Sequence, residues 1–133
     1  MLSVPFNFGA AHESRAEILK TYFGDYEANA PLGLLQKASH DAPFDFVKAG
    51  ARIFVLNGEL DPEDEILKPR DAFVKAWLEL TDNDSRGALA VDWMPGHNHI
   101  SPFASLSTGI EAEEAWGYQV VAFCDNIRKF DPR

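Results

Sequence analysis

The stretch RIFVLNG (residues 52–58) decides the fold class. Its unbroken run of β-branched and aromatic side chains is typical of a strand buried on both faces, as strands of parallel sheets are, and an Asn-Gly pair ends it. A second apolar run, ALAVDW (residues 88–93), predicts a parallel neighbour. A third strand is predicted over LSVPFNF (residues 2–8), which begins at Leu2 and ends at Phe8.

Helical signals alternate with these strands. Apolar stripes and capping residues predict helices over residues 15–23, 30–38, 69–80 and 112–129. Strands that alternate with helices predict an α/β fold in which about three parallel strands are flanked by helices, within a single domain over residues 1–133. The predicted core consists of large apolar side chains: Phe54, Leu56, Phe73, Trp77, Trp93, Trp116, Phe123 and Ile127.

Composition narrows the function classes. The 133 residues are 46% hydrophobic and 25% charged, as in an ordinary globular domain, and the net charge of −9 argues against a nucleic-acid partner. A single cysteine excludes an internal disulfide and a cysteine-based zinc site. No apolar run approaches the roughly 20 residues of a membrane helix, and the N-terminus does not read as a signal peptide. We therefore expect a cytoplasmic protein without a membrane partner.

Polar clusters follow two of the predicted strands. GELD (residues 58–61) comes at the end of the strand predicted over residues 52–58, and GHNH (residues 96–99) follows the strand predicted over residues 88–93. The carboxyl ends of parallel strands meet at one edge of a sheet, so an aspartate and a histidine there can form an orienting pair for proton transfer. Asp61 before a proline is also a good helix N-cap, and His97, His99 and Asp61 could alternatively hold a metal.

These clusters carry a family resemblance. IFVLNGELDP (residues 53–62) resembles the acid-bearing strand and turn of α/β-hydrolases, and GHNHIS (residues 96–101) resembles their catalytic-histidine loop. The resemblance is to the esterase and lipase branch of the family, which includes kynurenine formamidase-like and feruloyl esterase-like enzymes. The resemblance implies the C-terminal half of that domain, a three-layer partial α/β-hydrolase fold. It also implies that Asp61 is the triad acid and His99 the base, with His97 as the rival base.

The chain departs from the family at the nucleophile. It contains no G-x-S-x-G elbow and no glycine-rich oxyanion loop. The serines near the histidines, Ser101, Ser105 and Ser107, lack such an elbow. The resemblance thus implies descent from serine hydrolases that cleave small-molecule esters or amides without a cofactor, and an isolated chain that is inactive. The alternative is a truncated, non-catalytic pseudoenzyme that acts in binding or oligomeric assembly.

The missing half also predicts partners. In the family the nucleophile-bearing strand lies beside the strand expected at residues 2–8. Without it, that strand is an exposed apolar edge, which recruits another chain. We therefore expect self-association, or a nucleophile-bearing partner chain, through the edge from Leu2 to Phe8.

Overall fold

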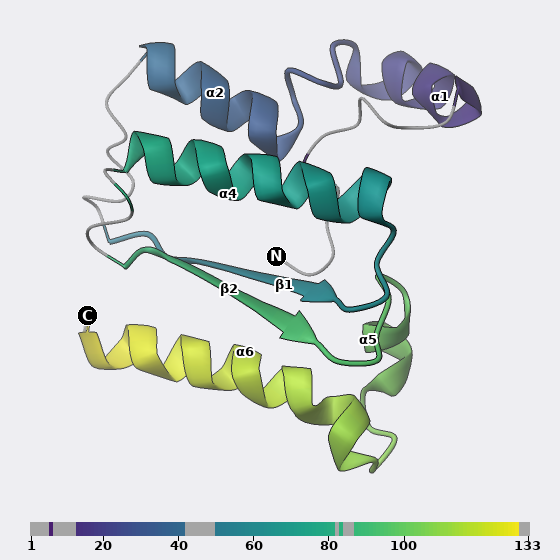
Figure 1. The fold of residues 1–133 in the computed structure, drawn as a ribbon, viewed down its shortest axis with the longest axis vertical. Coiled ribbons are helices and arrows are strands. Elements are labelled where there is room, and N and C mark those ends of the chain that lie inside the picture. The colour runs from purple at the N-terminus through teal and green to yellow at the C-terminus, as the bar shows by residue number, and fades with distance from the viewer. Residues whose placement is uncertain (1–5, 7–12, 42–49, 82, 84–86, 131–133) are drawn as a thin grey trace. The chain divides into compact units, whose positions relative to one another are not determined.

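The computed structural model describes Phe6 and residues 13–41, 50–81, 83 and 87–130. In chain order its elements are α1 (Glu13–Phe23), α2 (Pro31–Asp41), β1 (Ile53–Gly58), the π-helical turn η1 (Glu63–Leu67), α4 (Lys68–Leu80), β2 (Leu89–Met94), α5 (Ser101–Ser105) and α6 (Glu111–Phe130) (Figure 1). β1 and β2 pair in parallel as a two-stranded sheet, so the predicted α/β class and parallel pairing are confirmed. The third predicted strand, residues 2–8, lies outside the described residues except for Phe6.

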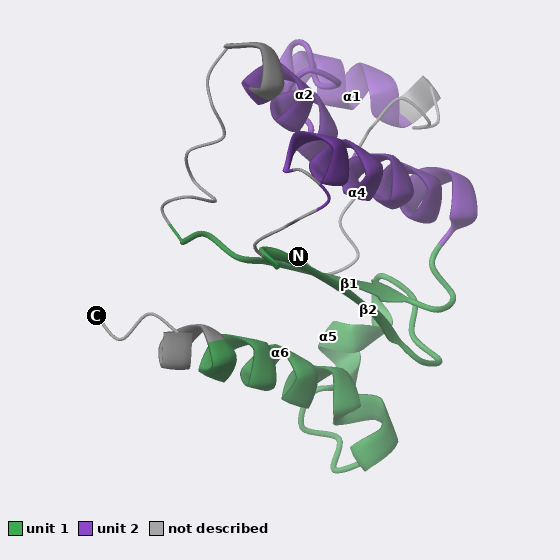
Figure 2. Cartoon of the chain, turned by 60° about the vertical axis from the view of Figure 1, so that its left-hand side comes forward, with its two compact units in different colours: residues 1–4, 49–61, 87–133 green, residues 5–48, 62–86 purple. Residues whose placement is uncertain are grey.

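The chain divides into two compact units (Figure 2). The first comprises residues 1–4, 49–61 and 87–133 and contains the sheet with α5 and α6. The second comprises residues 5–48 and 62–86 and contains α1, α2, η1 and α4. A single domain over residues 1–133 stays a prediction. Among the described residues, no helix is both long and apolar enough to cross a membrane.

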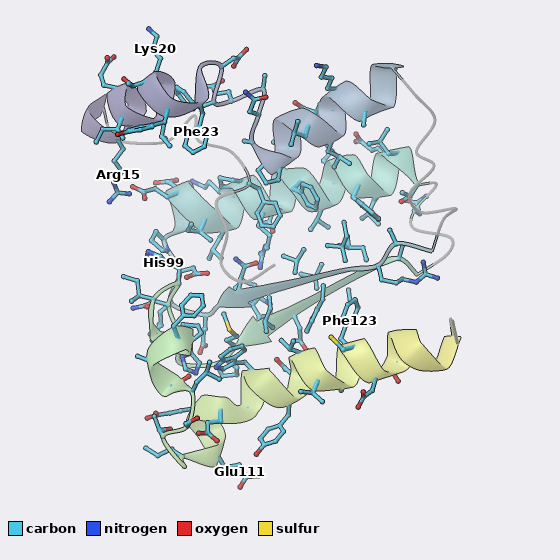
Figure 3. The ribbon with its side chains drawn as sticks, turned by 180° about the vertical axis from the view of Figure 1, so that it is seen from behind. Arg15, Lys20, Phe23, His99, Glu111 and Phe123 are labelled. Carbon is cyan, nitrogen blue, oxygen red and sulfur yellow. The ribbon has the colours of Figure 1, made fainter. Side chains whose placement is uncertain are left out.

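The core of the first unit lies between the sheet and α6. Leu56 of β1, Met94 of β2 and Trp116 of α6 are buried together. The rings of Phe54 and Phe123 stack at a centroid distance of 5.0 Å, and Figure 3 shows Phe123 on the sheet side of α6. The predicted burial of Leu56 and Trp116 is therefore confirmed.

The prediction that Trp93 belongs to the core is wrong. Its side chain is 40% exposed, and that of Val91 is 42% exposed. Side chains alternate along a strand, so Val91 and Trp93 share the face of β2 opposite Met94. The α6 helix packs on the Met94 face, which explains why Met94 is buried and Trp93 is not.

The second unit has its own core between α2 and α4. The buried side chains are Leu32 and Leu35 of α2, Phe73 and Trp77 of α4, and Phe6, whose ring lies 4.6 Å from that of Phe73. The predicted burial of Phe73 and Trp77 is confirmed.

Carboxylates gather at the start of the helical segment that leads into α4. The hydrogen bond and charge of Asp64, followed by the charge of Glu63, raise the pKa of Lys68. Asp64 lies 2.6 Å and Glu63 3.7 Å from the ammonium nitrogen. All these groups are exposed, so the cluster contributes little to stability.

Candidate active site

The two predicted polar clusters lie at one edge of the sheet. The register pairs Gly58 with Met94 at the ends of β1 and β2, so the turn at residues 58–61 and the loop at residues 95–100 leave the sheet side by side. Hydrogen bonds join them, from the Glu59 amide to the Met94 carbonyl (3.1 Å) and from the Leu60 amide to the His97 carbonyl (2.8 Å). The sheet topology therefore brings the candidate acid and the candidate bases together.

Asp61 is held from one side only. Its side chain is fully buried, and its Oδ2 accepts hydrogen bonds from the Gly58 amide (2.9 Å) and the Asn57 side-chain amide (3.3 Å). Its Oδ1 is buried and has no hydrogen-bond partner among the described residues. A buried carboxylate oxygen without a partner is costly, which makes Oδ1 a strong acceptor for a nearby donor.

His99 is the donor within reach. Its Nδ1 lies 3.9 Å from the unpaired Oδ1 of Asp61, and its side chain is 43% exposed. Figure 3 shows His99 on the loop that follows β2. The separation is longer than a hydrogen bond, but catalytic hydrogen bonds are often long in a site without substrate.

His97 is used differently. It is 5% exposed, and its Nε2 lies 3.0 Å from the Glu113 carbonyl oxygen. A carbonyl only accepts, so Nε2 carries the proton, and Nδ1 accepts from the Ser101 hydroxyl at 3.0 Å. Both ring nitrogens are therefore occupied, and the geometry favours His99 over His97 as the partner of Asp61.

The geometry gives little support to the two other hypotheses from the sequence, a metal site and a serine nucleophile near the histidines. The described residues contain no group of three His, Cys, Asp or Glu side chains that could hold a metal ion. The Ser101 hydroxyl bonds His97, and the Ser105 hydroxyl donates to the Pro102 carbonyl while accepting from the Trp116 indole. Both serines thus have structural partners.

The predicted N-cap role of Asp61 is wrong. The N-cap of η1 is Pro62, and no side chain caps this turn. The Asp61 carboxylate instead turns back toward Gly58 and Asn57. The Asp61 carboxylate is therefore bound by the amides at the end of β1 and not by a helix amide.

Sequence reasoning missed the residues that hold the acid. Asn57 is fully buried and donates to Asp61, and Glu59, on the same turn, accepts a hydrogen bond from the Gly96 amide at 3.0 Å. The available signal was a polar residue at the end of a buried strand, directly before the candidate acid.

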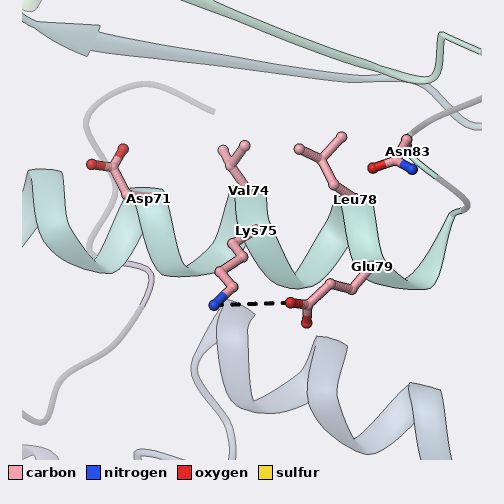
Figure 4. A pocket seen from close by; sticks show the side chains of 6 residues that line it. All are labelled: Asp71, Val74, Lys75, Leu78, Glu79 and Asn83. Atoms are coloured by element: carbon pink, nitrogen blue, oxygen red, sulfur yellow. Dashed lines mark ion pairs between the residues drawn. The ribbon is translucent and has the colours of Figure 1, made fainter.

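Two cavities bear on the location of the site. One of about 340 Å³ lies against the histidine loop, lined in part by His97, Ser101 and Glu113. Another of about 430 Å³ opens on α4, where Lys75 and Glu79 form an exposed ion pair at 3.9 Å (Figure 4). The second cavity includes none of the predicted site residues.

Comparisons with known protein families, curated proteins and solved structures find no match for this chain.

Proposed function

We propose that this chain is the C-terminal portion of an α/β-hydrolase of the esterase and lipase branch, with Asp61 as the acid and His99 as the base for ester or amide hydrolysis. The observation that supports it is the buried Asp61 carboxylate. One oxygen is anchored by the end of β1 and the other, without a hydrogen-bond partner in the described part, lies 3.9 Å from His99.

The proposal includes the finer fold. A third parallel strand at residues 2–8 would pair with β1 on the side away from β2, and helices would cover both faces of the sheet in three layers. The acid and the base would then follow neighbouring strands of one sheet, as triad members of this fold do.

The chemistry follows from the pair. Asp61 holds the ring of His99 with the proton on Nδ1 and stabilises the imidazolium that forms during reaction. Nε2 takes the proton of a nucleophile hydroxyl as it attacks the acyl carbon, then gives it to the leaving alkoxide or amine. The hydroxyl and the oxyanion-hole donors would come from a segment outside these 133 residues, or from a partner chain.

A non-catalytic role is the second candidate. Val91 and Trp93 expose apolar surface on one strand, which favours contact with another chain. A pseudoenzyme of this kind would keep the fold and use the strand for assembly.

An activated ester tests the acid–base assignment without a nucleophile half. The isolated chain is expected to be inactive toward ordinary esters and amides, but p-nitrophenyl acetate has a leaving group good enough for a positioned base and water to hydrolyse it slowly, so we expect slow hydrolysis of this ester. His99→Gln should lower this rate about tenfold or more, whereas His40→Gln, outside the pair, should leave it unchanged. Equal rates for His99→Gln and the parent chain would refute the assignment, and labelling by a fluorophosphonate would show that the chain has its own nucleophile.

A further inference from the structure

The turn that carries the acid is also hydrogen-bonded to the loop that carries the base. The Glu59 carboxylate accepts the Gly96 amide at 3.0 Å, in addition to the backbone bonds from the Glu59 and Leu60 amides to the Met94 and His97 carbonyls. We propose, on the basis of the function proposed above, that Glu59 is a positioning residue that sets the path of the loop to His99.

The hydrogen bond to Glu59 acts on a β-turn that can adopt two backbone conformations. The His97 amide bonds the Met94 carbonyl at 3.2 Å, which closes a four-residue turn with Pro95 and Gly96 at its centre. Gly96 has a φ of +71°, and proline followed by a residue of positive φ is the type II turn. Types I and II differ by a flip of the central peptide, the one that carries the Gly96 amide. By accepting that amide, Glu59 fixes the orientation of this peptide.

The orientation matters because His99 follows Gly96 closely. The Leu60 amide donates to the His97 carbonyl, and the Glu59 carboxylate accepts the Gly96 amide. The loop before His99 is therefore held at two points. Glu59 is itself two residues before Asp61, so one turn sets the positions of both members of the pair. A hydrogen bond that an exposed carboxylate accepts adds little stability, so we expect the loss of Glu59 to affect the placement of the loop more than the folding of the chain.

Ring nitrogen signals of the histidines test this in the full chain labelled with ¹⁵N-histidine at about pH 9, where imidazoles are neutral. In the parent chain His99 should carry its proton on Nδ1, toward Asp61, and Asp61→Asn should abolish that preference. Glu59→Ala should lose it to a similar extent and reduce p-nitrophenyl acetate hydrolysis about tenfold, the size expected for a misplaced base. Glu59→Gln keeps an acceptor oxygen and should restore both to the parent level.

His97 is the internal control. Its proton should remain on Nε2 in every variant, because the Glu113 carbonyl accepts it. A parent-like His99 in Glu59→Ala, while Asp61→Asn shifts, overturns the role of Glu59 alone. A parent-like His99 in both variants overturns the acid–base pair and the role of Glu59 with it.

Discussion

Trp77→Ala should lower the free energy of unfolding by about 3–5 kcal/mol, the usual cost of removing a large buried ring. Trp77 is fully buried, and its ring lies 6.3 Å from that of Phe73 on the same helix. The cavity that the ring leaves should fill only in part, because packed helices relax incompletely around a cavity. Urea unfolding followed by circular dichroism measures the loss.

Trp93→Ala is the matched control. Its side chain is 40% exposed on β2, so its removal should cost about 1 kcal/mol or less. Equal losses for the two variants would contradict the assignment of Trp77 to the core and of Trp93 to the surface.

Gly58→Ala should disturb both folding and the site. A Cβ at Gly58 would overlap the His97 carbonyl oxygen and lie 2.9 Å from the Cα of Asn98. Both are backbone atoms, so the histidine loop must move, at a cost of about 1–3 kcal/mol. His99 moves with that loop, and we expect p-nitrophenyl acetate hydrolysis to fall about tenfold or more.

Gly117→Ala makes the same substitution where there is room. Among the described residues, no heavy atom beyond its chain neighbours and the local backbone of α6 lies within 4 Å of the added Cβ, so alanine should stabilise the helix by about 0.5–1 kcal/mol. Gly58→Ala with parent-like stability and rate would show that the close approach of the two loops is not required for the site.

Local patterns predicted much of the fold. The run at residues 52–58 became β1, and the periodic stretch at residues 69–80 became α4 (Lys68–Leu80). These predictions succeed because strand and helix periods depend on near neighbours in the chain.

Two of the failures concern contacts between residues that are far apart in the chain, and the third concerns the conformation of a turn. Trp93 has the type of a core residue, but its exposure depends on which face of β2 receives α6. The carboxylate of Asp61 was free to cap a helix or to bind the end of β1, and only the conformation of the turn decides. The Glu59–Gly96 bond joins residues 37 positions apart, and no local pattern predicts it.

The most direct test of the central claim is the protonation of the His99 ring in the unmodified chain. ¹⁵N signals of the neutral imidazole distinguish a proton on Nδ1 from one on Nε2. We predict a proton on Nδ1, hydrogen-bonded to Asp61, and its loss in Asp61→Asn. A His99 ring with its proton on Nε2, identical in the parent chain and in Asp61→Asn, would contradict the acid–base pair.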